Sequence, residues 1–138
     1  MDKLLVFTDG GARGNPGPAA AGVVVKNSRG EVIFSQKKFL GKKTNNEAEY
    51  AAVELAVAWL EKNLSLFSQI EFYFDSLLVT KQLKGEWKVK AAHLRPQIAG
   101  IKEKLAALGK PVDFFYLPRK KNTLADALVN QALDEAGF

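Results

Sequence analysis

The sequence predicts an α/β fold with the element order βββαβααβα. Three observations lead to this prediction. Residues 4–39 hold three short apolar or β-branched runs separated by glycine-containing turns, helical periodicity begins at Asn45, and two later strand candidates alternate with helical stretches. The chain has 138 residues, 47% of them hydrophobic, which suits one compact core. We therefore expect a single domain over residues 1–138.

Three strands are expected before residue 40. Residues 4–8 form an apolar run that Asp9-Gly10-Gly11 stops, and residues 20–26 are β-branched and bounded by Pro18 and by a turn at residues 28–30. Residues 31–39 are the third candidate. The short connections predict an antiparallel meander, with Asp9 at the end of its first strand.

The later elements alternate strands with helices. Val53, Ala56 and Leu60 recur at helical spacing and predict an amphipathic helix over residues 45–60. Strands are expected at residues 70–74 and 112–117, and further helices at residues 76–84, from near Pro96 to residue 108, and at residues 123–136. The last helix offers four residues for packing: Leu124, Leu128, Ala132 and Leu133.

Composition excludes several classes of function. The chain has no cysteine, which rules out disulfide frameworks, thiolate zinc sites and cysteine nucleophiles. The N-terminal apolar run reaches an acid at Asp9 and is too short for a signal peptide or a membrane span, so we expect a cytoplasmic protein without a membrane partner. The net charge of +5 favours a polyanionic partner without proving one.

Four acids stand out by their position in the predicted elements. Asp9 and Asp75 follow strands, at the sheet edge where α/β proteins bind ligands, and Glu49 and Asp126 lie in helices. Glu49 shares a helix face with Val53 and the apolar stripe, so its charge points toward the core. Burying an unpaired carboxylate is costly, and coordination of a cation offsets that cost.

Three of the four acids also have a purely structural interpretation. A single Asp after a strand is common in turns. Thr44 and Glu47 fit a capping box, which favours Glu49 over Glu47 as a site residue, and Thr123 and Asp126 fit the same start-of-helix pattern. The acids indicate chemistry only if they converge, because their repulsion then requires cations such as Mg²⁺ or Mn²⁺, and two such ions suit in-line phosphoryl displacement.

The glycine-rich stretch at residues 9–18 matches no nucleotide-binding loop. It lacks Walker A spacing and the GxGxxG register, and a β-branched run follows it in place of a helix. We interpret it as a tight connection between two strands, with its backbone near Asp9.

In this order and spacing, the motifs resemble those of type 1 ribonuclease H. The matching segments are Thr8-Asp9-Gly10-Gly11, Gly14-Asn15-Pro16-Gly17, Thr44-Asn45-Asn46 followed by Glu49, Asp75-Ser76, and Asn122 followed by Ala125-Asp126. No single motif decides the resemblance. The set of motifs is highly specific and spans residues 4–136.

The resemblance implies the ribonuclease H-like fold, a five-stranded mixed sheet flanked by helices. It also implies an endonuclease that hydrolyses the RNA strand of RNA/DNA hybrids and leaves 5′-phosphate and 3′-hydroxyl ends. Two Mg²⁺ ions would act with the substrate, with Mn²⁺ as the alternative ion. The catalytic and metal-binding residues carried over from the family are Asp9, Glu49, Asp75 and Asp126.

The family motifs also imply substrate contacts. Asn15, Asn45 and Asn46 would lie beside the minor groove and bond 2′-hydroxyls. Thr44 would touch a phosphate of the DNA strand while capping its helix, two roles that compete for one hydroxyl. The other motif residues assigned to substrate binding are Gly10, Gly11, Ser76 and Asn122.

Two regions depart from the family pattern. Many members carry a catalytic histidine shortly before the last aspartate, whereas residues 117–122 hold none, and the only histidine, His93, is interpreted as a surface residue. Arg119 and the two lysines after it would contact phosphate or form a solvated charge cluster. The basic protrusion of bacterial members is reduced to residues 84–90, in which Trp87 and Lys88 would grip the DNA backbone unless Trp87 packs under the next helix.

The preferred hypothesis is therefore a monomeric ribonuclease H whose partner is an RNA/DNA hybrid. One alternative is a related nuclease or strand-transfer enzyme of the same fold that acts on double-stranded RNA or other duplexes. The other alternative is a non-catalytic hybrid-binding module. The intact set of acids argues against the module, and the missing histidine argues mildly for it.

Overall fold

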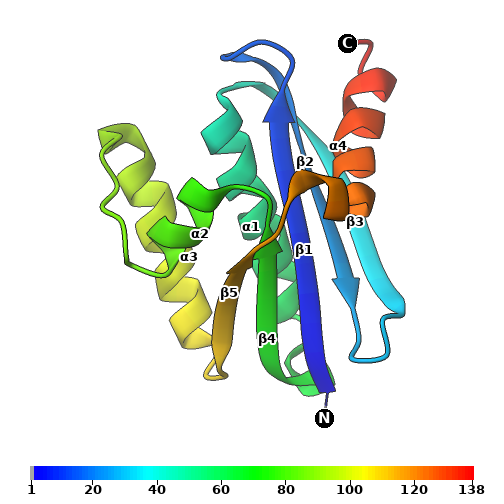
Figure 1. Cartoon of the computed structure of the whole chain (residues 1–138), viewed down its shortest axis with the longest axis vertical. Coiled ribbons are helices and arrows are strands. Elements are labelled where there is room, and N and C mark those ends of the chain that lie inside the picture. Colours follow the sequence, from blue (N-terminus) through cyan, green and yellow to red (C-terminus); the bar gives the residue numbers. More distant parts are fainter. Residues whose placement is uncertain (1) are drawn as a thin grey trace.

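The computed structural model describes residues 2–138 and shows a five-stranded mixed sheet with helices on both faces (Figure 1). The strands are β1 (Asp2–Ala12), β2 (Gly17–Lys26), β3 (Val32–Lys43), β4 (Phe67–Phe74) and β5 (Val112–Tyr116). The helices are α1 (Asn45–Glu61), α2 (Leu77–Leu83), α3 (Arg95–Ala107) and α4 (Thr123–Glu135). The predicted element order and fold class are confirmed. No helix in this part of the chain is long and apolar enough to cross a membrane.

The strands lie in the order β3-β2-β1-β4-β5. β1, β2 and β3 pair antiparallel, which is the expected meander, and β1, β4 and β5 pair parallel. Helices make the connections between the parallel strands, because such strands need a long crossover. This order puts β1 in the centre of the sheet, next to β4.

The first strand is longer than predicted, and this changes the position of Asp9. β1 continues through Gly10 and Gly11 to Ala12, so the prediction that Asp9 ends the strand was wrong. Asp9 pairs with Gly22 of β2, and the residues after it continue the same ladder. Glycine does not stop a strand whose backbone groups are all paired with a neighbour, so Asp9 lies within the sheet rather than in a turn.

The helix boundaries agree closely with the sequence. Thr44 is the N-cap of α1, and its reciprocal bonds with Glu47 confirm the predicted capping box. Ser76 caps α2 by accepting a bond from the Val79 N–H at 3.2 Å. The sequence did not predict the three 3-10 turns at Leu64–Leu66, Ala92–Leu94 and Arg119–Lys121, which are too short to show a periodic pattern.

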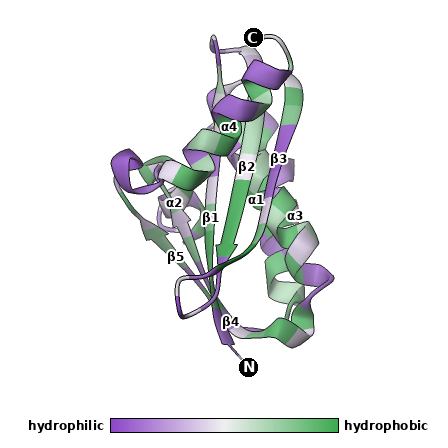
Figure 2. Cartoon of the chain, turned by 90° about the vertical axis from the view of Figure 1, so that its right-hand side faces the viewer, coloured by the Kyte–Doolittle hydropathy of each residue, from purple (hydrophilic) through white to green (hydrophobic). Residues whose placement is uncertain are grey.

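The main core fills the space between the sheet and the layer of α1 and α3. Figure 2 shows the sheet between this layer and α4. The cluster joins buried residues of β1, β2 and β4 to the apolar faces of the helices. Its largest fully buried members are Tyr50, Phe67, Phe72, Leu4, Leu60, Ile70, Ile98 and Ile101. The predicted apolar faces of α1 and α3 are therefore in the core.

A second, smaller core lies between α4 and the opposite face of the sheet. It consists of Ala20, Val129, Ala132 and Leu133. The prediction that Leu124 packs there was wrong, because that side chain is 49% exposed. Ala132 and Leu133 are buried as predicted, and Ala125 and Val129 complete the buried stripe in place of Leu124.

Gly10 allows α1 to lie directly against β1. A Cβ atom at this position would stand 2.2 Å from the carbonyl carbon of Ala48 and 2.4 Å from the amide nitrogen of Glu49. Backbone atoms cannot yield as the end of a side chain can, so a larger residue here would move α1 as a body.

Gly10→Ala is expected to destabilise the protein by about 1–3 kcal/mol, the usual cost of overpacking a core. The measurement is the free energy of unfolding from urea denaturation. Gly11→Ala is the matched control, because its Cβ atom would find its nearest neighbour at 3.8 Å, an ordinary contact with Val129. Equal stabilities for the two variants would contradict the close approach of α1 and β1.

Candidate active site

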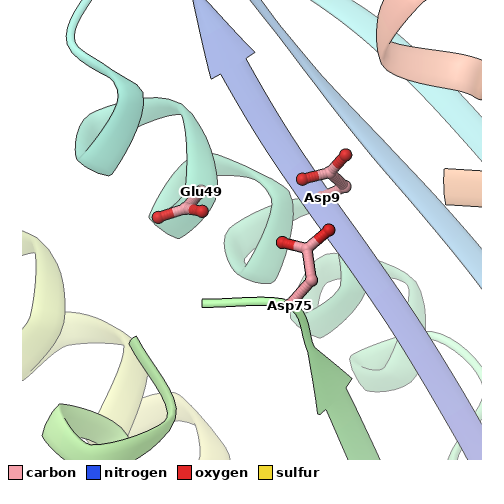
Figure 3. A group of neighbouring side chains, drawn as sticks. All are labelled: Asp9, Glu49 and Asp75. Carbon is pink, nitrogen blue, oxygen red and sulfur yellow. The ribbon is translucent and has the colours of Figure 1, made fainter. Parts of the chain in front are cut away.

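Three acidic side chains meet where β1, β4 and α1 lie together. Asp9 comes from β1, Glu49 from α1, and Asp75 directly follows β4 (Figure 3). Each offers one carboxylate oxygen, and these atoms all lie within 4.8 Å of one another. The structure thus brings together three of the four acids that the sequence singles out.

Asp9 is the one of these three acids that is buried as a whole residue, backbone included. It is 4% exposed, and its Oδ1 atom has no hydrogen-bond partner among residues 2–138. Burial raises the pKa of Asp9 to about 7, with further contributions from the negative charges of Asp75 and Asp126. An unpartnered buried carboxylate oxygen is costly, and a bound cation would remove that cost.

Glu49 faces the same point from the helix side. Burial raises its pKa to about 8, and the negative charges of Asp75 and Asp9 add to the shift, while a side-chain hydrogen bond with Ser76 opposes it. The contact of Gly10 with this turn of α1 holds Glu49 against β1. The prediction that its charge points inward therefore agrees with its surroundings.

Asp75 is held by an amide from the loop before α4. Asn122 is 2% exposed, and its Nδ2 group donates to the Thr8 carbonyl at 3.0 Å and to Asp75 Oδ2 at 3.4 Å. These bonds link the ends of β4 and α4 to β1. They account for Asn122 as a positioning residue and do not require the substrate contact assigned to it from the sequence.

Arg119 lies beside the acids without occupying their centre. Its Nε atom is 3.8 Å from Asp75 Oδ2, and its side chain is 72% exposed while that of Asp75 is 2% exposed. Burial raises the pKa of Asp75, and the Asn122 bond and the charge of Arg119 oppose that shift. An ion pair this long with an exposed partner is weak, so Arg119 is free to meet another anion.

Asp126 stands outside the group of three. It lies in the first turn of α4 and lines the same cavity, and its charge contributes to the raised pKa of both Asp9 and Asp75. Asn122, not Thr123, is the N-cap of α4, so the predicted start-of-helix pattern is displaced by one residue. The carboxylate accepts a bond from Asn130 Nδ2 at 3.4 Å instead of making a capping bond.

One open cavity of about 490 Å³ contains the four acids and many of the predicted substrate contacts. The predicted residues that line it are Asp9, Gly10, Gly11, Asn45, Asn46, Glu49, Asp75, Ser76, Arg119 and Asp126. Its wall includes side chains from both layers of helices and from the central strand. The cavity is therefore one continuous polar surface around the acids.

The role of Gly22 was not predicted from the sequence. This residue pairs with Asp9 across the β1–β2 ladder. A Cβ atom here would lie 2.7 Å from the carbonyl oxygen of Ala125, the residue before Asp126. Gly22 therefore lets α4 approach the sheet, as Gly10 does for α1, and its only sequence signal is a glycine inside a β-branched run.

Asn15 and Asn45 join the glycine-rich connection to the start of α1. The Asn45 N–H donates to Asn15 Oδ1 at 3.0 Å, and the Ala12 N–H donates to Asn45 Oδ1 at 2.8 Å. Both bonds use the carbonyl end of an asparagine side chain. The NH₂ ends, which make no hydrogen bond within the described chain, keep their capacity to donate.

The two roles predicted for Thr44 are compatible. Its hydroxyl accepts the bond from the Glu47 N–H at 3.2 Å, and its own N–H donates to Glu47 Oε1 at 2.9 Å. A hydroxyl has one proton to donate besides the lone pairs that accept. The capping bond therefore leaves that proton available to a phosphate oxygen.

A second cavity, of about 690 Å³, lies between α2 and the segment that follows it. Asn46, Trp87, Lys88 and Lys90 are among the residues that line it. Trp87 is 45% exposed and so is not buried under α3, the alternative considered from the sequence. Asn46 borders both cavities, which makes them neighbours.

His93 and the two lysines after Arg119 are surface residues that do not line the cavity around the acids. His93 is exposed, as predicted, and lines neither cavity. Lys120 and Lys121 are exposed in the 3-10 turn that also carries Arg119. No imidazole within residues 2–138 therefore takes the place of the family's loop histidine.

Comparison with known proteins relates this site to a family. Residues 7–132 match the family model described as reverse transcriptase-like. Ribonuclease HI of Halobacterium salinarum is 40% identical over 135 residues, which cover 97% of this chain and 66% of that protein. The bifunctional protein Rv2228c of Mycobacterium tuberculosis is 37% identical over 136 residues, and this chain spans only 36% of its length.

Solved structures show the same likeness over nearly the whole chain. LC11-RNase H1, isolated from compost, is 38% identical with a TM-score of 0.92 over 99% of both chains. A second structure of that protein, in complex with an RNA/DNA hybrid, has a TM-score of 0.90 at 37% identity and covers 96% of this chain and 98% of its own. With the same fold and the family's acids in one cavity, this chain belongs to the type 1 ribonuclease H family.

Proposed function

We propose that this protein is a divalent-metal-dependent endonuclease that hydrolyses the RNA strand of RNA/DNA hybrids. One observation carries the proposal: one carboxylate oxygen from each of Asp9, Glu49 and Asp75 lies within 4.8 Å of the other two. In addition, Asp9 Oδ1 has no hydrogen-bond partner among the described residues. Family membership supports the reaction. The hybrid bound by LC11-RNase H1, 37% identical, supports the substrate.

The donor set fits a hard divalent cation. Asp9, Glu49 and Asp75 offer only oxygen atoms, which suit Mg²⁺ or Mn²⁺ better than softer metals. Asp126 would add a ligand from the α4 side of the same cavity. Bound there, two such ions would activate the attacking water and stabilise the departing 3′ oxygen, which leaves a 5′-phosphate.

The protein's own residues prepare the site for these ions. Gly10 on β1 lets α1 approach the sheet, Gly22 on β2 lets α4 approach it from the opposite face, and Asn122 holds Asp75 in place. Ser76 caps α2 and lines the same cavity as Glu49 and Asp75. Arg119 is exposed beside Asp75 and would meet a phosphate of the substrate.

The asparagines are suited to recognise the RNA strand. Asn15 and Asn45 use their carbonyl ends within the protein, so their NH₂ groups would donate to 2′-hydroxyl oxygens, as would the amide of Asn46. The Thr44 hydroxyl proton would bond a phosphate of the DNA strand. Trp87 and Lys88, beside the second cavity, would hold the DNA backbone further along.

We also propose that residues 1–138 form a single nuclease domain. The expectations of a monomeric state and a cytoplasmic location stay predictions. Double-stranded RNA stays an alternative substrate, to be compared with the hybrid in the same assay.

Cleavage of a labelled RNA/DNA hybrid is expected only with Mg²⁺ or Mn²⁺. Loss of a residue that hydrogen-bonds to a metal ligand typically costs up to about 100-fold in activity. Asp9→Asn should reduce the cleavage rate by more than this, because it alters a proposed metal ligand itself. The assay compares hybrid, double-stranded RNA and single strands with and without Mg²⁺. Asp113→Asn, an exposed change on β5, is the control and should keep full activity.

Cleavage without metal, or full activity of Asp9→Asn, would overturn the mechanism. Hybrid binding with no product at any Mg²⁺ or Mn²⁺ concentration would establish the non-catalytic module instead. Equal cleavage of double-stranded RNA would favour the alternative nuclease.

The metal-free protein should lose stability as the pH rises. Asp9 and Glu49 have ordinary pKa values of 3.8 and 4.5 but are raised to about 7 and about 8 in the folded state. Between about pH 5 and pH 8 the folded state therefore binds more protons than the unfolded state, and the free energy of unfolding falls. Urea denaturation in EDTA at both pH values measures the change.

Two comparisons isolate this effect. Asp9→Asn should flatten the pH dependence, because it removes one of the two titrating acids and the repulsion it exerts on Glu49. Mg²⁺ should recover stability at pH 8, since the ion binds the folded protein. The free energy of unfolding should therefore fall more in the wild type than in Asp9→Asn between about pH 5 and pH 8. A smaller fall, or a rise, in the wild type would contradict the raised pKa values.

Lys88→Gln should weaken hybrid binding in a salt-dependent way. On B-form DNA, loss of one phosphate contact lowers the magnitude of the slope of log binding constant against log salt concentration by about 0.9. We expect a similar change for the RNA/DNA hybrid. Filter-binding titrations from low to high KCl give this slope. Lys102→Gln, an exposed change on α3, is the control, and an identical slope for both variants would argue against a DNA contact at Lys88.

A further inference from the structure

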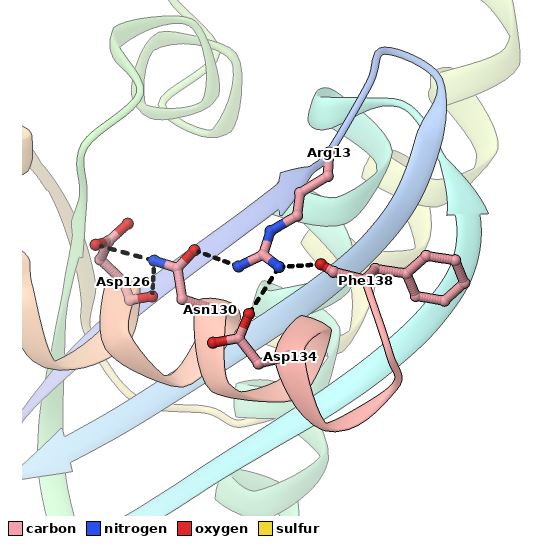
Figure 4. A network of polar contacts seen from close by, with 5 residues as sticks. All are labelled: Arg13, Asp126, Asn130, Asp134 and Phe138. Carbon is pink, nitrogen blue, oxygen red and sulfur yellow. Dashed lines mark hydrogen bonds and ion pairs between the residues drawn. The ribbon is translucent and has the colours of Figure 1, made fainter.

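A chain of polar contacts links the glycine-rich connection to Asp126 through a single asparagine (Figure 4). Arg13 Nη2 donates to Asn130 Oδ1 at 3.2 Å. Asn130 Nδ2 then donates to the Asp126 carbonyl oxygen at 3.1 Å and to its carboxylate Oδ2 at 3.4 Å. Asn130 lies one helical turn after Asp126 on α4 and lines the same cavity.

The hydrogen-bonding capacities of Arg13 and Asp126 determine which way the Asn130 amide faces. An arginine side chain has only donors, and an ionised carboxylate has only acceptors. The Oδ1 atom of Asn130 must therefore face Arg13, and its NH₂ group must face Asp126. In this orientation the amide transmits the position of Arg13 to the carboxylate.

Arg13 is itself held from the far end of α4. Its Nη1 atom donates to Asp134 Oδ1 at 2.7 Å and to the backbone oxygen of Phe138. Its backbone N–H donates to the Pro18 carbonyl at 2.8 Å, which closes the glycine-rich connection. The guanidinium is thus fixed against α4 while its backbone belongs to the strand connection beside Asp9.

The position of the Asp126 carboxylate depends on these hydrogen bonds more than the positions of the other three carboxylates do. Asp9 and Glu49 are held by the packing of β1 against α1, and Asp75 by Asn122. Among the residues that the structure describes, Asn130 is the one side chain that bonds the Asp126 carboxylate. We propose that Asn130 is a positioning residue that aims Asp126 at the metal site, and that Arg13 acts through Asn130. This inference rests on the proposed function.

The test separates positioning from a simple clamp on α4. These hydrogen bonds lie at the surface, where a single bond contributes little to the free energy of unfolding. If Asn130 aims a metal ligand, its loss changes metal affinity without a matching loss of stability. A clamp would change stability and leave metal affinity unaltered.

Asn130→Ala is expected to raise the Mg²⁺ concentration for half-maximal hybrid cleavage by about 10-fold, as loss of a partner behind a metal ligand does. Isothermal titration of the metal-free protein with Mn²⁺ should show the same loss of affinity and does not depend on catalysis. Gln131→Ala is the matched control: it removes an exposed amide from the same helix, one that contacts Lys37 at 3.5 Å and not Asp126. Its metal affinity should stay within about twofold of wild type.

A double-mutant cycle tests whether Arg13 acts through Asn130. Arg13→Lys keeps the positive charge, and so the electrostatics of the site, but loses the planar fork that holds Asn130 and Asp134 together. It should weaken Mn²⁺ binding in the wild-type background and have no further effect in Asn130→Ala. Additive losses would overturn the coupling between the two residues.

The outcomes of these measurements distinguish a failure of the positioning role of Asn130 from a failure of the proposed function. Wild-type Mn²⁺ affinity in Asn130→Ala, together with reduced affinity in Asp126→Asn, would overturn the positioning role and leave the proposed function intact. Absence of both metal binding and hybrid cleavage in the wild type would overturn the proposed function and this inference with it. A loss of affinity in Asn130→Ala with an unchanged urea midpoint is the result expected.

Discussion

Electrostatic repulsion among buried carboxylates is the constraint on which the site depends. One carboxylate oxygen from each of Asp9, Glu49 and Asp75 lies within 4.8 Å of the other two. Burial raises the pKa of each, and the charges of neighbouring acids, with Asp126 among them, add to the shift. A folded protein keeps such an arrangement only where packing elsewhere holds the acids together. The cost of the repulsion is the physical reason that the cluster suits a divalent cation.

Close packing of two helices against the sheet holds the acids together despite this repulsion. Gly10 on β1 admits α1, and Gly22, which pairs with Asp9 from β2, admits α4, so helices on opposite faces of the sheet both pack closely beside Asp9. The antiparallel ladder keeps Asp9 inside β1, and the parallel pairing of β4 sets Asp75 beside it. The site is therefore built on regular elements, which hold side chains more rigidly than loops do.

Asparagine side chains form the layer around the acids, and each serves the fold with one end. Asn15 and Asn45 accept backbone bonds through their carbonyl oxygens, which leaves donors for a substrate. Asn122 and Asn130 donate to Asp75 and Asp126. An amide suits this layer because it carries a donor and an acceptor without adding charge to an already repulsive centre.

Local patterns in the sequence were enough to predict the element order, the capping box at Thr44 and the inward face that carries Glu49, because these depend on periodicity and on neighbours within one turn. The choice of the four acids also needed the resemblance to the family motifs, since the local pattern around Asp126 equally fits the start of a helix. The extension of β1 past Asp9, the role of Gly22 and the exposure of Leu124 were not predictable in this way. Each depends on partners distant in the sequence: a strand ends where its neighbour stops pairing, and a glycine is required where another element approaches. Contacts between distant segments are a property of the folded chain, so only the assembled sheet and helices could establish them.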